Sequence, residues 1–265
     1  MVFALILRGH VRDSFQNNYL NEMISYLYKR LGYFHIFIQT WKNIEAKPGH
    51  SWRELKDLKL EVTTKFIRDY FDKKVLIQHI MILDDSNIDD ELYGDVSGII
   101  PYTLANKKGW KYMWYGKHKI ADYVKKSKVN YKFVINTRLD LFGGQLMRTI
   151  NRSLQTNINH KHMRFITNLS NYSIKYKELY LKIINYLQNS NIPVFQFEED
   201  KPGIDNFYIC NKDDNFNISY LFHFHLDYII ENTIEKVKFI YQEVMVANVG
   251  KNLGKYSELL KHKDI

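Results

Sequence analysis

Polar and charged side chains follow one strongly apolar stretch near the middle of the chain. Residues 133–135 are Phe, Val and Ile, which favour a buried strand. The next five residues include Asn136, Thr137, Arg138 and Asp140. Ligands of open α/β sheets bind beyond the carboxyl ends of the strands, so a strand that ends in a guanidinium and a carboxylate indicates a site. We predict that Arg138 and Asp140 form the centre of a site for a phosphorylated donor.

A second group of such side chains follows the apolar run at the N-terminus. This run reads as a buried strand, and Arg8, Gly9, His10 and Arg12 come after it. Glycine lets the backbone approach a ligand closely, and arginine matches the geometry of phosphate. Ser14 is expected to cap a following helix, whose N-terminus would favour an anion. A diphosphate near Gly9 is therefore expected, although the stretch matches neither the dinucleotide-binding nor the P-loop pattern.

Two further predicted strand borders carry side chains suited to a site. Thr40 and Trp41 end an apolar, β-branched run over residues 33–39. Asp205 follows a glycine and precedes another apolar run over residues 207–210. An aspartate in that position can act as a general base or hold a sugar hydroxyl. An Asx turn or a cap is the commoner use of Asp-Asn, and the residues leave both interpretations open.

Histidine and carboxylate spacing gives little support for a protein-built metal site. The acidic residues of segment 84–91 lack the EF-hand spacing and are expected to form a solvated loop. His160 and His162 alternate on a predicted strand, but no third ligand is spaced to join them. His223 and His225 stand among apolar residues, which favours buried structural histidines.

Strand and helix patterns alternate along the chain, which predicts an α/β fold. Apolar runs predict strands over residues 2–7, 33–39, 75–83, 133–135, 160–167, 192–197 and 207–210. Helical patterns cover residues 14–31, 51–70, 102–128, 176–187, 217–230 and 231–248, followed by a basic tail that is expected to fray. Trp110, Met113 and Trp114 fall on one helical face, so we expect core packing for two of the three.

Composition narrows the class of protein and its partners. The 265 residues are 45% hydrophobic and 25% charged, and they include 20 Tyr and 16 Phe but only 4 Pro, which argues against disorder. The net charge of +9 indicates an anionic partner. Because the basic residues are spread and no RNA-binding signature is present, we expect no nucleic-acid partner. Peripheral contact with an anionic membrane surface stays open.

Cysteine count and the N-terminal run indicate the compartment. Cys210 is the only cysteine, so no intramolecular disulfide can form. The apolar run before Arg8 is too short for a signal peptide or a membrane span. We expect a soluble, cytoplasmic protein.

The order of these motifs resembles that of nucleotide-sugar-dependent glycosyltransferases of the GT-A type, especially those of bacterial surface polysaccharides and large DNA viruses. The resemblance covers roughly residues 1–215 and is carried by residues 7–12, 39–41, 136–140 and 203–207. It implies a GT-A-like single domain with a Rossmann-type, mostly parallel central sheet flanked by helices. Residues 1–130 would form the nucleotide-binding half, 131–230 the donor-sugar and acceptor half, and 231–265 a C-terminal helical extension. A viral member would work in the host cytoplasm.

The resemblance also implies an activity and a set of site residues. The activity is transfer of a hexose or pentose from a nucleoside-diphosphate sugar to a hydroxyl of a glycan or glycoconjugate, in glycan biosynthesis. Asp205 and Asp140 are the implied catalytic residues. The implied donor-binding residues are Arg8, Gly9, His10, Arg12, Thr40, Trp41, Asn136, Arg138 and Asp140.

One departure from the family pattern concerns the metal. Arg138 stands where an Asp-x-Asp motif would place its first carboxylate. Either Asp140 helps to hold Mn²⁺ or Mg²⁺, with His225 as a further candidate ligand, or Arg138 neutralises the diphosphate without a metal. The sequence leaves both open.

Two other classes of function compete with this interpretation. A basic nucleic-acid-binding protein would use lysines and aromatic rings, but it gives the Arg-x-Asp motif no purpose. A nucleotidyltransferase or another phosphate-handling transferase would need two or three metal-binding carboxylates at strand ends, which are not evident. The sequence does not specify the sugar, the nucleotide, the acceptor, inversion or retention, or the oligomeric state.

Overall fold

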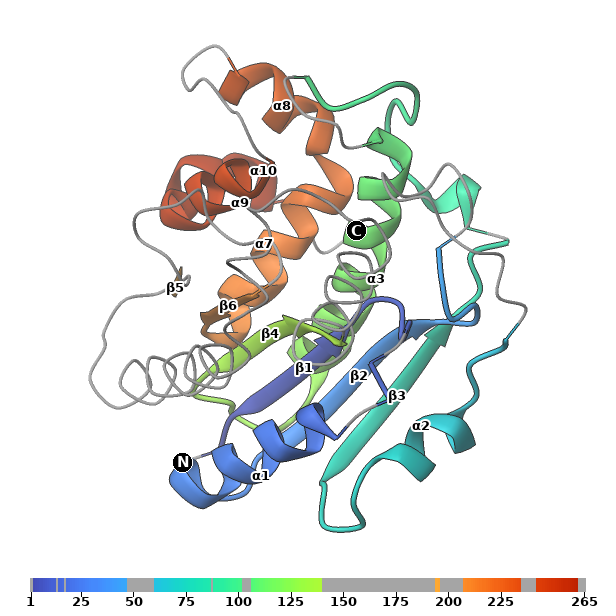
Figure 1. The fold of residues 1–265 in the computed structure, drawn as a ribbon. Helices are drawn as coiled ribbons and strands as arrows, with labels where there is room; N and C mark the ends of the chain where they lie inside the picture. The colour runs from blue at the N-terminus through green and yellow to red at the C-terminus, as the bar shows by residue number, and fades with distance from the viewer. Residues whose placement is uncertain are drawn as a thin grey trace, which may run out of the picture.

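A six-stranded sheet in the order β3-β2-β1-β4-β6-β5 forms the centre of the protein (Figure 1). The computed structural model describes residues 2–12, 14–16, 18–46, 60–86, 88–101, 106–139, 194–195, 207–234 and 242–261. The strands are β1 (Ala4–Arg8), β2 (His35–Trp41), β3 (Ile77–Leu83), β4 (Val134–Arg138), β5 (Val194–Phe195) and β6 (Phe207–Cys210). Only β6 runs against its neighbours, so the sheet is mostly parallel, and the expected α/β class is confirmed.

Helices cover both faces of this sheet (Figure 1). One face carries α1 (Tyr19–Leu31) and α2 (Thr64–Tyr70), and the other carries α3 (Lys107–Lys126) and α7 (Lys212–Phe224). The remaining helical elements are α8 (Leu226–Ile234), α9 (Gln242–Lys251), α10 (Ser257–Leu260), and the 3₁₀ turns η1 (Asp89–Glu91) and η3 (Leu253–Tyr256).

Strand β1 lies at the centre of the core. It pairs in parallel with β2 on one side and β4 on the other, and all five of its residues are buried. Leu5 and Leu7 face the α1 side, whereas Ala4 and Ile6 face the α3 side. A parallel strand that is covered on both faces is apolar along most of its length, which explains the apolar run that precedes Arg8. Each fully buried Leu or Ile contributes about 1.5–3 kcal/mol.

The first helix starts later than the sequence indicates. Ser14 does not cap it: α1 begins at Tyr19 after Asn18, and no side-chain capping bond forms. The loop after β1 extends through this position: the Arg12 N–H donates to the Ile44 carbonyl, and Arg12 adopts φ 55°. The Ser14 N–H then donates to the Val11 carbonyl, so Ser14 lies in a turn and does not begin the helix. The carboxyl end of α1 is as expected, since Gly32 follows it with φ 77°.

The C-terminal helices also differ from the prediction. α7 begins at Lys212, and the helical stretch expected over residues 217–230 breaks at His225 into α7 and α8. The tail does not fray up to Lys261, because η3 and α10 place apolar side chains against the core between α3, α7 and α9. The strand and helix expected over residues 160–167 and 176–187 lie outside the described residues.

The acidic segment that follows β3 is not simply solvated. Asp85 is buried and accepts a hydrogen bond from Asn43 at 3.0 Å. Asp89 accepts a hydrogen bond from the Tyr112 hydroxyl, and Glu91 accepts one from the Tyr115 hydroxyl at 2.7 Å. The bond from Asn43 joins the segment to the residues after β2, and the two tyrosine bonds join it to α3. The cluster therefore has a structural role that the spacing of its residues does not reveal.

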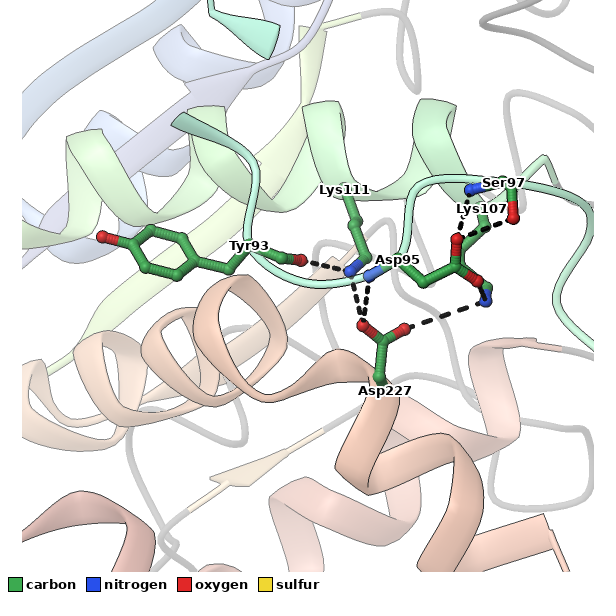
Figure 2. Close-up of polar contacts among 6 residues, drawn as sticks. All are labelled: Tyr93, Asp95, Ser97, Lys107, Lys111 and Asp227. Carbon is green, nitrogen blue, oxygen red and sulfur yellow. Dashed lines mark hydrogen bonds and ion pairs between the residues drawn. The ribbon is translucent and has the colours of Figure 1, made fainter. Parts of the chain in front are cut away.

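A network of ion pairs and hydrogen bonds joins three segments that are far apart in the sequence (Figure 2). Lys111 of α3 is buried, and its Nζ donates to the Tyr93 carbonyl and to Asp227 Oδ2, the latter at 2.8 Å. The same carboxylate of α8 accepts from the Asp95 N–H at 3.0 Å. Asp95 in turn pairs with Lys107 at 2.6 Å. Because Lys111 is removed from water, its charge requires these partners.

Gly94 and Gly98 provide a matched test of this network. Both have positive φ, 75° and 71°, but a Cβ at Gly94 would lie 2.0 Å from Asp227 Oδ2, whereas one at Gly98 would meet nothing within 4 Å. Gly98→Ala should lower the free energy of unfolding by about 1–2 kcal/mol, the cost of a left-handed backbone at a residue with a Cβ. Gly94→Ala should lower it by about 1–3 kcal/mol more, because the clash displaces Asp227 from Lys111. Urea denaturation measures both; equal losses would contradict this account of the loop.

Candidate functional site

The candidate site lies at the carboxyl end of the sheet, between β1 and β4. The chain leaves β1 toward β2 on one side, and β4 later pairs with the other side of β1. This reversal of strand order is the place where open α/β sheets bind their ligands. Arg8 and Arg138 are register partners at the ends of these two strands. Two guanidinium groups therefore originate from adjacent positions, about 4.8 Å apart, on the face covered by α3.

Arg8 is held by a buried chain of amide groups. Its Nε donates to Asn136 Oδ1 at 2.5 Å, and Asn136 Nδ2 donates to Asn215 Oδ1 at 3.2 Å. Arg8 is 1% exposed, and both asparagines are fully buried. Burying a cation is costly, so its position depends on hydrogen bonds of this kind. The chain joins β1, β4 and α7, although Arg8 and Asn136 are 128 positions apart in sequence.

The loop after β1 crosses the end of β2 and is fixed there. Gly9 has φ 96°, which only glycine adopts without strain, and its N–H donates to the Gln39 carbonyl at 3.0 Å. His10 stacks on Trp41 with ring centroids 5.8 Å apart, and its Nδ1 contacts the Asn43 carbonyl at 3.1 Å. This conformation explains why a glycine stands at the start of the loop, whereas the predicted approach of a ligand to Gly9 stays a prediction.

Arg12, at the far end of this loop, forms an ion pair. Its Nε lies 3.2 Å from Glu45 Oε1, and both side chains are 10% exposed. This pair ties the loop to the segment after β2. Arg12 therefore holds the loop in position. It follows the end of β1 by four residues, whereas Arg8 is the last residue of that strand.

Thr40 and Trp41 do not share one environment. Consecutive strand residues point to opposite faces, so Trp41 faces α3 while Thr40 faces the α1 side. The Trp41 ring is buried among apolar residues that include Tyr112 and Tyr115. Of these two predicted donor-binding residues, only Trp41 lies on the face that carries Arg8 and Arg138.

The two predicted catalytic residues, Asp140 and Asp205, lie outside the described residues. Their described neighbours in the chain are near the same edge: Leu139 follows β4, and Phe207 pairs with Thr137 at the start of β6. Because β6 is antiparallel to β4, it begins where β4 ends.

Two buried polar residues near the site were not identified from the sequence. Asn215 on α7 carries no motif. Lys117 on α3 is fully buried, and its Nζ lies 3.6 Å from the centroid of the Trp114 ring. The sequence does contain a sign of the buried Lys117. It follows Trp110 by seven residues and Trp114 by three, which places a charged side chain on the apolar face of the helix.

Histidine side chains form an aromatic cluster beyond the site instead of a metal centre. His118 of α3 and His223 of α7 stack with centroids 5.0 Å apart, beside Phe224 and Tyr115. Burial lowers the pKa of His118 to about 4 and that of His223 to about 3. His225 follows α7, about 15 Å along the helix axis from Asn215. Within the described ranges, no three His, Cys, Asp or Glu side chains are grouped so that they could hold a metal ion.

The fold and the site together define an α/β protein with two arginines at the switch point of its sheet. Comparison with protein-family models, with curated proteins and with solved structures found no match. In the part of the chain that the structure describes, no helix combines the length and the apolarity needed to cross a bilayer.

The histidine cluster predicts an acid-dependent loss of stability. In the folded protein the pKa values of His118 and His223 lie below the ordinary 6.5, so between pH 6.5 and about 4 the unfolded chain binds more protons. The free energy of unfolding should therefore fall as the pH drops through this range, by up to ~1.4 kcal/mol per pH unit for each histidine. Nearby Asp122 opposes the shift of His118, and Lys119 reinforces it.

His223→Phe tests this expectation while it keeps an aromatic ring in the cluster. The variant should lose less stability than the wild type between pH 6.5 and 4, because one of the two histidines no longer takes up a proton on unfolding. Urea denaturation at half-unit pH steps provides the slopes. Identical slopes for the two proteins would show that the cluster does not control the acid response.

Proposed function

We propose that this protein is a glycosyltransferase of the GT-A type, which transfers a sugar from a nucleoside-diphosphate donor to a hydroxyl of a glycan or glycoconjugate. The observation that carries the proposal is the pairing of Arg8 with Arg138 at the switch point of the sheet. Two guanidinium groups that originate from neighbouring strand positions offer the positive charge and the N–H donors that an anion requires. A diphosphate has the charge and the oxygen geometry for this position.

The arrangement gives the donor-binding residues different tasks. Arg138 is only partly buried and belongs to the open end of β4, so it contacts the diphosphate directly. Arg8 lies deeper and supports the charge from beneath. Gly9 and His10 remain partly accessible at the β1 edge and line the nucleotide side of the site. Arg12, Thr40, Trp41 and Asn136 shape this edge through their packing and hydrogen bonds.

Catalysis in this proposal depends mainly on positioning the substrates and on stabilising the leaving diphosphate. Arg138 supplies positive charge to the leaving group, and Asp205 deprotonates the acceptor hydroxyl in an inverting reaction. Asp140 holds the donor sugar or, together with Mn²⁺ or Mg²⁺, the diphosphate. Described residues offer no complete ligand set for such an ion, so a metal would rely on Asp140 and on the donor's own phosphate oxygens.

The proposal is tested by ligand binding to the wild type and to two arginine variants. UDP, GDP, CDP and dTDP and their sugars, each with and without Mn²⁺, should raise the melting temperature if they bind the folded state. Arg138→Ala should weaken the binding of the effective nucleotide roughly 10- to 100-fold, the loss expected for a charged hydrogen bond of about 1.5–3 kcal/mol. Arg68→Ala, on the exposed side of α2, removes the same charge elsewhere and should bind normally.

Several outcomes would count against the proposal. If no nucleotide or nucleotide sugar raises the melting temperature of the wild type, the protein is not a nucleotide-sugar enzyme. Binding of oligonucleotides with a steep salt dependence would favour the nucleic-acid alternative. Hydrolysis or transfer of a nucleotidyl group would favour a nucleotidyltransferase.

The catalytic assignment needs a separate variant. Asp205→Asn keeps the size of the side chain but removes its basicity, so it should reduce the rate of sugar transfer by 10²-fold or more and leave donor binding within about twofold. A radiolabelled donor with a glycan acceptor measures the rate, and calorimetry with the nucleoside diphosphate measures binding. Full transfer activity in Asp205→Asn would exclude it as the base.

A further inference from the structure

The buried asparagine of α7 is not explained by packing. Asn215 is fully buried and lies on the side of α7 that faces the sheet. Its Oδ1 accepts from Asn136, but its Nδ2 has no hydrogen-bond partner in the described structure. A buried N–H group without a partner lowers stability. What the asparagine adds is the acceptor that it offers to the Asn136 NH₂ group.

What Asn215 provides is the orientation of a second amide. Because the Asn215 oxygen accepts, the NH₂ group of Asn136 must face α7. The carbonyl oxygen of Asn136 then faces β1, where it accepts from Arg8 Nε at 2.5 Å. With an apolar residue at position 215, the Asn136 NH₂ group would lose its acceptor, and the side chain could rotate away from Arg8 toward another one.

The Nε bond in turn fixes the plane of the Arg8 guanidinium. The group is planar, so the anchored nitrogen restricts the directions in which the two terminal nitrogens can point. Arg8 supports a phosphate from beneath, so the placement of its terminal N–H groups decides how close its positive charge comes to the ligand. A rotation of the plane would move that charge away from the edge between β1 and β4.

We infer that Asn215 is a positioning residue of the phosphate site: through Asn136 it orients the guanidinium of Arg8 toward a phosphorylated ligand. This inference rests on the proposed function for the identity of the ligand. It adds α7 to the elements that build the site, and it assigns a role to a residue that no motif marks.

Two variants and their combination test the chain of contacts. In Asn215→Leu, binding of the nucleoside diphosphate that binds the wild type best among UDP, GDP, CDP and dTDP should weaken about tenfold in calorimetry. The melting temperature without ligand should fall by only about 2–4 °C, since one buried hydrogen bond is lost. Asn136→Leu should weaken binding at least as much. The double variant should bind no more weakly than Asn136→Leu, because Asn215 acts through Asn136.

Ser219→Ala is the matched control on the same helix. Ser219 is fully buried, and its hydroxyl donates to the Phe216 carbonyl at 2.8 Å, so the variant removes a buried polar group of α7 outside the chain of amides. It should bind the nucleotide within about twofold of the wild type. If Asn215→Leu does not fold, Asn215→Ala removes the same oxygen without adding a branched side chain.

A direct readout of Arg8 separates positioning from folding. The Arg8 Nε–H should exchange slowly with solvent in the wild type and in Ser219→Ala, and at least tenfold faster in Asn215→Leu. Its resonance is assigned by its loss in Arg8→Lys. Unchanged nucleotide binding in Asn215→Leu, or additive losses in the double variant, would overturn the inference while the proposed function stands. A wild type that binds none of the four nucleotides would overturn both.

Discussion

The burial of Arg8 at the end of β1 is the constraint on which the rest of the structure depends. A strand that is paired on both sides and covered on both faces can carry a charged residue only at its end, where hydrogen-bonding groups can reach it. Arg8 occupies that position with 1% of its surface exposed. The elements around it supply what a buried guanidinium requires: β4 brings Asn136 to Nε, and α7 brings Asn215 to Asn136.

The same constraint explains why polar residues are concentrated at one edge of the sheet. The amino-terminal parts of β1, β2 and β4 are apolar and are held by packing between α1 and α3. Their carboxyl-terminal residues include Arg8, Gln39, Asn136 and Arg138 on the α3 face. Along these parallel strands the residues change from apolar to polar, so the buried polar groups lie at the carboxyl end, which is the end where open α/β sheets bind ligands. Packing therefore dominates at one end of the strands, and hydrogen bonding at the other.

Sequence patterns recovered the strands better than the helix boundaries. β1, β2, β3 and β4 were predicted from apolar runs within a few residues of their ends. The reason is clearest for β1 and β2, whose residues are nearly all buried and mostly apolar. The start of α1 was wrong, because the hydrogen bond from Arg12 to Ile44 and the left-handed Arg12 are decided by a neighbouring loop. Because consecutive strand residues point to opposite faces, the sequence of β2 already places Thr40 and Trp41 on different sides of the sheet, which the order of the motifs does not show.

By itself, the sequence determined that the protein is an α/β fold whose strands end in arginine, glycine and asparagine, because apolar periodicity and polar strand tips are local properties. The tertiary structure decided which of these tips meet. Register placed Arg8 opposite Arg138, and the packing of α7 brought Asn215 to Asn136 across 79 positions of sequence. It also buried Lys117 against Trp114. Strand order, register and helix docking depend on contacts between distant segments, and such contacts leave no periodic trace in the chain.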